Sequence, residues 1–172
     1  MTKNRFEALF TDQSKVLRLI LIVSAIPLCI AYILEFGFGK IPCAMCVYER
    51  YPYFIGLFAA ILGLTVPAPK IKEFCIITAS FFFLVGIFVT LYHIGIEEKI
   101  FALPELCKAP KLSAHSLEDM ESLIASRPIV RCDIASMKIN GISLTVFNVF
   151  YGILALDIGL LYFIQKKKNG SR

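Results

Sequence analysis

Residues 74–96 read FCIITASFFFLVGIFVTLYHIGI, a stretch without a single Asp, Glu, Lys or Arg. About 20 consecutive apolar residues are long enough to cross the hydrocarbon core of a bilayer as an α-helix. The segment is also too long for a helix buried in an ordinary soluble domain. It therefore predicts a membrane-spanning helix.

Three further apolar segments lie at about 16–38, 51–66 and 142–164. The segment 51–66 is short, so we expect its helix to begin earlier, from about Val47. Hydrophobic residues make up 58% of the 172 residues, and a mean hydropathy of +0.73 lies outside the range of soluble domains. The sequence predicts one integral membrane domain over 1–172, an all-α bundle of four transmembrane helices.

Basic residues predict the orientation of the four spans. Ten Lys and Arg lie at the two ends and between the second and third spans, and eight lie in the other two connections, which are about twice as long. Because cytoplasmic segments are enriched in Lys and Arg, we expect both termini in the cytoplasm. The loops at about 39–50 and 97–141 then lie outside. The net charge of +5 reflects this topology and gives no support for a nucleic-acid partner.

The six cysteines divide according to this topology. Two pairs lie in the outer loops, Cys43 with Cys46 and Cys107 with Cys132. Four aqueous cysteines on the non-cytoplasmic side are typical of an oxidising compartment. Cys29 and Cys75 lie in or beside apolar spans, where we expect them to be inert small hydrophobic residues.

The first pair forms a Cys-x-x-Cys motif that is followed closely by Arg50. If the second helix begins near Cys46, Arg50 lies at i+4 on the same face, and Glu49 is rotated about 100° away. The guanidinium and the positive end of the helix would then stabilise a Cys46 thiolate. At membrane depth, a lipid-soluble quinone is the natural electron acceptor. Nearby tyrosines line such a site or act as interfacial anchors.

Metal and haem chemistry fit this motif less well than redox chemistry. Zinc requires a second such pair or added histidines at ligand spacing, and the sequence has neither. Covalent haem requires His directly after the second cysteine, where Val47 stands. We therefore predict a redox pair and no metal.

The second pair, Cys107 and Cys132, has two interpretations. It is a structural disulfide that closes the long loop around an amphipathic segment at about 116–124, or it exchanges electrons with the first pair. An ordinary structural cystine has a reduction potential below about −300 mV. Its oxidation of a dithiol whose reduction potential is near about −120 mV is therefore uphill by roughly 8 kcal/mol. An active loop pair must therefore be strained or be oxidised by a stronger final acceptor, which a quinone supplies.

These features together resemble the disulfide bond formation protein B (DsbB) family. The likeness rests on the Cys43–Cys46 motif with Tyr48-Glu49-Arg50, on Tyr92-His93, and on Cys107 with Val130-Arg131-Cys132-Asp133. It implies a four-helix bundle in the bacterial inner membrane that reoxidises a periplasmic DsbA-like thioredoxin-fold oxidase. The electrons pass to the membrane quinone pool, either ubiquinone or menaquinone.

The resemblance also implies a role for each matched cysteine. Cys107 forms the mixed disulfide with the partner oxidase, and Cys132 is its loop mate. Cys43 takes electrons from the loop pair, and Cys46 meets the quinone.

Two further residues are assigned to the quinone by the same resemblance. Arg50 stabilises the thiolate–quinone adduct, and His93 matches a position associated with the quinone site. Asp157 lies inside the fourth span, where carboxylates are often functional, but it is far from the cysteines and receives no role.

Two other classes of protein share parts of this pattern. Quinone reductases of the vitamin K epoxide reductase type are also small bundles, but their loop cysteines precede the Cys-x-x-Cys, whereas here they follow it. Non-catalytic scaffolds of the tetraspanin type carry structural disulfides in a large loop between the third and fourth spans. Their Cys-Cys-Gly motif is absent from this sequence.

Overall fold

The computed structural model describes residues 9–108, 130–135 and 137–170, and its elements are mostly helices. In chain order they are α2 (Gln13–Tyr32), the π-helical turn η1 (Ile33–Gly37), α3 (Ala44–Tyr48), α4 (Tyr51–Thr65), α5 (Pro69–Glu97), the 3₁₀ turn η2 (Glu105–Cys107), the antiparallel strands β1 (Lys138–Ile139) and β2 (Ile142–Ser143), and α7 (Leu144–Gly170). The amphipathic segment expected at about 116–124 lies outside the described residues.

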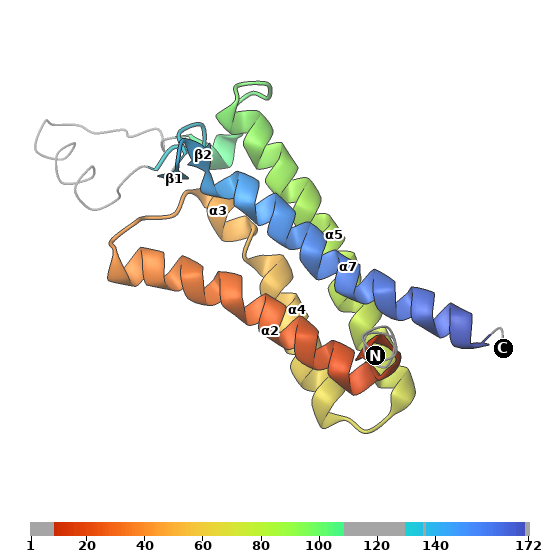
Figure 1. Ribbon diagram of the computed structural model, residues 1–172. Coiled ribbons are helices and arrows are strands. Elements are labelled where there is room, and N and C mark those ends of the chain that lie inside the picture. The colour runs from red at the N-terminus through yellow and green to blue at the C-terminus, as the bar shows by residue number, and fades with distance from the viewer. Residues whose placement is uncertain (1–8, 109–129, 136, 171–172) are drawn as a thin grey trace, which may run out of the picture.

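The long helices form a bundle with the short elements gathered at one end (Figure 1). Helix α4 packs between α2 and α5, and α7 packs along the other side of α5. The beginning of α2 and the end of α7 lie at the same end of the bundle, opposite α3 and the two strands. The fold therefore brings α3, η2 and the start of α7 together.

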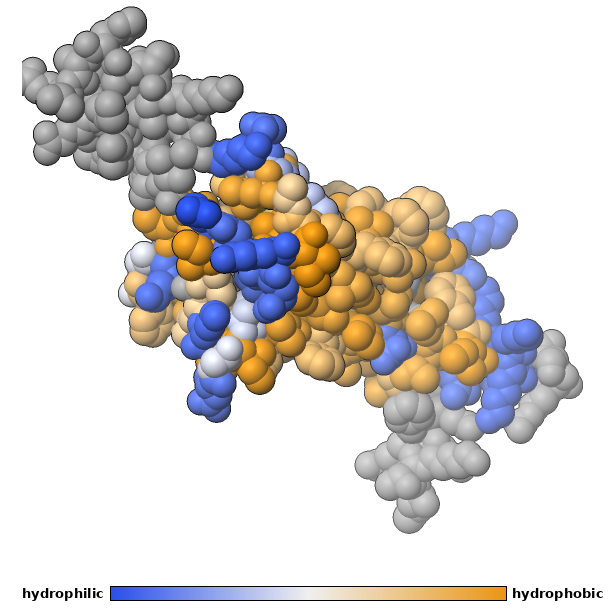
Figure 2. Space-filling view, turned by 90° about the horizontal axis from the view of Figure 1, so that it is seen from above, coloured by the Kyte–Doolittle hydropathy of each residue, from blue (hydrophilic) through white to orange (hydrophobic). Residues whose placement is uncertain are grey.

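Among the residues that the structure describes, three helical segments are long and apolar enough to cross a membrane: Gln13–Gly37, Pro69–Glu97 and Leu144–Asn169. Their positions agree with the apolar runs in the sequence. The surface also agrees with a membrane-spanning protein. Charged side chains gather toward the two ends of the molecule, and apolar side chains cover much of the surface between them (Figure 2). Helix α4, with 15 residues, is shorter than the roughly 20 that a span requires.

Small residues let α4 approach its neighbours closely, as is common between membrane helices. A Cβ atom added to Gly56 would lie 2.6 Å from Ser24 Oγ on α2 and 2.8 Å from the ring of Phe83 on α5. Around this contact lies the main apolar core, which includes Leu17, Ile20, Ile76 and Phe83. The core therefore holds α4 against both α2 and α5.

The helix expected to continue from about Val47 into the second apolar segment is interrupted, so that expectation was wrong. Helix α3 ends at Tyr48, Glu49 and Arg50 form a turn, and α4 begins at Tyr51. The physical reason is Pro52 in the first turn of α4, which has no N–H to bond the carbonyl of Tyr48. Arg50 therefore does not lie one regular helical turn beyond Cys46.

Candidate functional site

The Cys43–Cys46 pair stands at the beginning of α3. Cys43 is the N-cap residue, and its Sγ accepts a hydrogen bond from the backbone N–H of Cys46 at 3.3 Å. The two sulfur atoms are 2.8 Å apart and not covalently joined. Cys43 is buried, whereas Cys46 is partly exposed.

These hydrogen bonds decide which sulfur is the better anion. The hydrogen bond from the Cys46 thiol is the main cause that lowers the pKa of Cys43, and burial opposes it. The same hydrogen bond, followed by burial, raises the pKa of Cys46. Of the two sulfurs, Cys43 is therefore the one on which the anion is favoured, whereas the sequence-based expectation placed the thiolate on Cys46.

His93 reaches the pair from α5. Its Nε2 lies 3.6 Å from the Cys43 sulfur, and its Nδ1 lies 2.6 Å from Oε1 of Glu49. The other oxygen of Glu49 accepts a hydrogen bond from Asn148 Nδ2 at 2.9 Å, and Asn148 Oδ1 accepts one from the Tyr53 hydroxyl at 2.7 Å. A continuous chain of polar contacts thus leads from Cys43 to α7 and α4.

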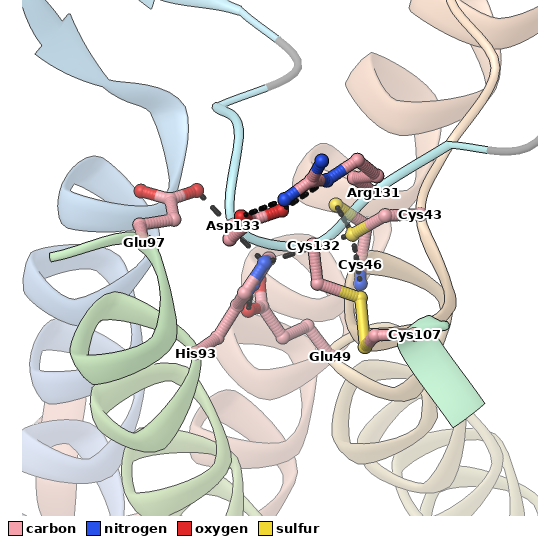
Figure 3. Close-up of a disulfide and its surroundings, with 9 residues drawn as sticks. All are labelled: Cys43, Cys46, Glu49, His93, Glu97, Cys107, Arg131, Cys132 and Asp133. Atoms are coloured by element: carbon pink, nitrogen blue, oxygen red, sulfur yellow. Dashed lines mark hydrogen bonds and ion pairs between the residues drawn. A yellow bond between two sulfur atoms is a disulfide. The ribbon is translucent and has the colours of Figure 1, made fainter. Parts of the chain in front are cut away.

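Figure 3 shows Glu49 beside His93 and close to both cysteine pairs. The expectation that Glu49 is rotated about 100° from the face of Cys46 and Arg50 assumed a continuous helix, whereas Glu49 contacts His93, the residue that reaches Cys43. A second carboxylate also approaches the imidazole, since Glu97 Oε1 lies 3.9 Å from His93 Nε2. Thr145 holds Glu97 through a 2.8 Å hydrogen bond.

Arg50 is held by the end of the first span. Its guanidinium donates to Glu35 Oε2 at 2.5 Å and lies over the ring of Tyr32, 5.1 Å from the centroid. Sequence reasoning did not identify Glu35, although a carboxylate inside an apolar segment was a signal. Glu35 balances the positive charge that was expected to act on Cys46.

A cavity of about 230 Å³ joins Cys46 and Arg50. Its wall is mostly apolar and comes from α2, η1, the segment before α3, and the first turns of α7. The residues that matter for its chemistry are Ile26, Ile30, Phe147, Cys46, Arg50 and Glu49. Tyr53 lines it as well, whereas His93 is not among the lining residues and touches the cavity through Glu49.

Cys107 and Cys132 form a disulfide with a Cα–Cα separation of 5.6 Å. Both are buried, and they pack in one apolar cluster with Cys43, Met45 and Ile96. Figure 3 shows this disulfide next to the Cys43–Cys46 pair. The fold thus brings together all four cysteines that the sequence singled out.

The segment around Cys132 carries an ion pair at its surface. Arg131 donates two hydrogen bonds to Asp133, at 2.9 Å and 2.6 Å, and this contact lowers the pKa of Asp133. Figure 3 shows the pair above the Cys107–Cys132 disulfide, and the Arg131 side chain is exposed.

Apolar helices of membrane-spanning length and two adjacent cysteine pairs at one end are features of membrane thiol–disulfide exchange proteins. The chain belongs to the family of disulfide bond formation protein DsbB, whose sequence model matches residues 13–162. It is also similar to the uncharacterized protein RP370 of Rickettsia prowazekii (strain Madrid E). The two are 31% identical over 162 residues, which cover 92% of this chain and 93% of the relative. No solved structure matches significantly.

Membership of this family identifies the chain as a multi-pass membrane protein of disulfide-bond formation, with thiol oxidoreductase activity. The match agrees with the resemblance seen in the sequence. It favours that interpretation over a tetraspanin-type scaffold and over a reductase of the vitamin K epoxide type.

Proposed function

We propose that the chain reoxidises a periplasmic DsbA-like dithiol oxidase and passes the electrons through its two cysteine pairs to a membrane quinone. In this proposal α4 completes a four-span bundle in the bacterial inner membrane. Both termini face the cytoplasm, and the two cysteine pairs lie at the periplasmic rim. The whole chain acts as one integral membrane domain.

The cavity shared by Cys46 and Arg50 is the observation that carries this proposal. A quinone needs an apolar slot for its ring and polar groups near its oxygens, and this cavity has both. Ile26 and Ile30 line it and are 43% and 49% exposed on the outer face of α2. An isoprenoid tail can therefore leave the cavity toward lipid. A bound quinone supplies an acceptor for two electrons and two protons.

Electrons move between the pairs by thiol–disulfide exchange. A thiolate of the partner attacks the Cys107–Cys132 disulfide at Cys107, and the partner leaves as a disulfide. The two loop thiols then reduce a Cys43–Cys46 disulfide, whose S–S bond breaks as the loop bond re-forms. Packing of both pairs in one cluster supports this direct transfer.

Protons follow the polar chain that starts at Cys43. The Cys46 thiol already donates to the Cys43 sulfur, which can act as its base. His93 Nε2 accepts a proton from Cys43, and Nδ1 passes one to Glu49. Because Glu49 also lines the cavity, the protons released by the dithiol reach the acceptor without passing through bulk water.

Thiol trapping in membranes tests the proposal. When quinone is withheld, Cys43 and Cys46 should accumulate as thiols, and added quinone should reoxidise them. Cys46→Ser should abolish turnover while the protein remains inserted. Cys29→Ser is the matched control, because Cys29 is an exposed cysteine of α2 outside both pairs, and it should retain turnover. Cystines that form regardless of quinone supply would contradict the proposal.

A further inference from the structure

The reduced Cys43–Cys46 pair and His93 form a set of metal ligands. Cys43 Sγ, Cys46 Sγ and a ring nitrogen of His93 all lie within 4.8 Å of one another. Two thiolates and an imidazole are donors that zinc prefers. We propose that the reduced protein binds one zinc-type divalent ion through these three residues.

Sequence spacing could not reveal this site. The histidine lies 50 residues beyond Cys43, far outside the short ligand spacings by which zinc motifs are recognised. Packing of α5 against α3 brings it to the sulfur atoms. The prediction of no metal rested on the motif alone.

The surroundings of His93 orient it as a ligand. A metal-bound histidine usually donates its second ring N–H to a carboxylate, which fixes the tautomer. Here Nδ1 lies 2.6 Å from Glu49 Oε1, and Asn148 holds the other Glu49 oxygen at 2.9 Å. With the proton on Nδ1, the lone pair of Nε2 points toward Cys43.

Zinc is usually four-coordinate, so the site needs one more ligand. Glu97 Oε1 lies 3.9 Å from His93 Nε2 and lines the same cavity as Cys46, so it or a water from the cavity can complete the tetrahedron. The sulfurs, now 2.8 Å apart, must separate to about 3.8 Å for two Zn–S bonds of about 2.3 Å. Cys46 borders the cavity, which leaves space beside its side chain for this separation.

Binding is linked to the redox state of the pair. The ion forms two Zn–S bonds and displaces whichever thiol protons the pair still carries, and no electron is transferred. A Cys43–Cys46 disulfide offers no thiolate and does not bind. If the proposed electron transfer is correct, a bound ion also blocks it, because both sulfurs are then held as metal thiolates.

Cadmium titration of the full-length protein in detergent tests the binding directly, without quinone. The protein carries Cys107→Ser and Cys132→Ser to remove the loop thiols, and thiolate-to-cadmium absorbance in the ultraviolet reports binding. We expect one equivalent to bind the reduced protein and none to bind the oxidised protein. Equal binding in both redox states would overturn the proposal.

Variants identify the ligands. Cys46→Ser should remove the tight site, and Glu49→Gln should weaken it about 10- to 100-fold, as is typical for a residue that orients a metal ligand. Cys29→Ser/Cys75→Ser should bind like the parent, because neither cysteine belongs to the set. Unchanged affinity in His93→Gln would overturn the assignment.

X-ray absorption of the zinc-loaded protein provides a second readout. We expect two sulfur scatterers at about 2.3 Å and nitrogen or oxygen at about 2.0 Å. Oxygen and nitrogen alone would overturn the proposal. In a separate arm, added zinc should slow quinone reduction and a chelator should restore it. Binding without this inhibition would leave the metal site standing and argue against the proposed electron route.

Discussion

Two carboxylates, Glu35 and Glu49, decide how charge is distributed around the Cys43–Cys46 pair. Glu35 pairs with Arg50 and balances its positive charge. Glu49 is buried against His93 and lies close to the sulfurs. Together they leave the Cys43 thiolate stabilised mainly by its own local hydrogen bonds.

Glu35→Gln should increase the reactivity of Cys46. Loss of the carboxylate leaves the Arg50 guanidinium uncompensated in the cavity that it shares with Cys46. We expect alkylation of Cys46 at neutral pH to become about tenfold faster, which corresponds to one pKa unit. Mass spectrometry of the alkylated reduced protein measures the rate.

The matched control is Glu73→Gln, which breaks a comparable ion pair with Lys166 at the other end of the bundle. It should leave Cys46 unchanged. If Glu35→Gln reacts no faster than this control, Arg50 does not influence Cys46.

Glu49→Gln should slow reduction of the electron acceptor by about 10²-fold, the usual contribution of a positioned acid or base. The amide retains the shape of the side chain and its bond to Asn148, but it cannot relay a proton from His93. Exchange between the two cysteine pairs needs no such relay and should be unchanged. Rapid-mixing measurements of the two steps separate these effects. Equal slowing of both would point to misfolding of the site.

The Cys43 thiolate should persist at lower pH than an ordinary thiolate. Its pKa is lowered chiefly by the Cys46 thiol, with Glu49 acting in the opposite direction. Because a lowered pKa favours the anion, thiolate absorbance should appear at a lower pH than for a free cysteine, near 8.5. The titration is run with a chelator, in protein whose other four cysteines are serine.

Cys46→Ala removes the thiol that donates to Cys43, so it should move this titration to higher pH. An unchanged midpoint would show that the Cys46 thiol does not stabilise the Cys43 thiolate.

At the residue scale, the sequence identified the cysteines, Arg50 and His93 because each belongs to a recognisable local motif. It could not place Glu35 and Asn148, whose contacts join segments from different helices. The expectation of a Cys46 thiolate considered Arg50 and the helix end but not the hydrogen bond between the two thiols, which favours the anion on Cys43.

At the scale of elements, the apolar runs predicted the long helices well. The run at 74–96 lies within α5, and the run at 142–164 lies largely within α7. Both helices extend beyond the apolar residues at their Lys-bearing ends, because backbone hydrogen bonding continues past the hydrophobic segment. Hydropathy therefore located these helices but did not fix their ends.

Gly56→Ala should destabilise the packing of α4 against α2 and α5. The added methyl would meet Ser24 Oγ and the Phe83 ring at less than 3 Å, and overpacking of this kind costs about 1–3 kcal/mol. Thermal unfolding in detergent should show a lower midpoint.

Gly37→Ala provides the control, because its added methyl meets Ile33 at an ordinary 3.8 Å. It should have little effect on the midpoint. Equal stability of the two variants would indicate that α4 does not pack tightly where the structure places it.

For the whole molecule, the short α4 raises the question of how it would cross the bilayer in the proposed four-span bundle. Its 15 residues rise about 22 Å, less than the roughly 30 Å hydrocarbon core. The polar turn and α3 continue the chain beyond its end, so the site lies at the depth where α4 stops. A bilayer that thins locally around α4 would accommodate the difference and bring lipid-soluble molecules to the level of Cys46.

Direct transfer of electrons from Cys46 to a lipid-soluble acceptor is most directly tested by counting quinone in a single anaerobic turnover. Reduced Cys107→Ser/Cys132→Ser protein is mixed with a soluble ubiquinone or menaquinone analogue, and quinone absorbance is followed. We predict that one quinone is consumed per protein as the Cys43–Cys46 disulfide forms, and none when Cys46→Ser is added. Quinone consumption that survives loss of the Cys46 sulfur would contradict the account.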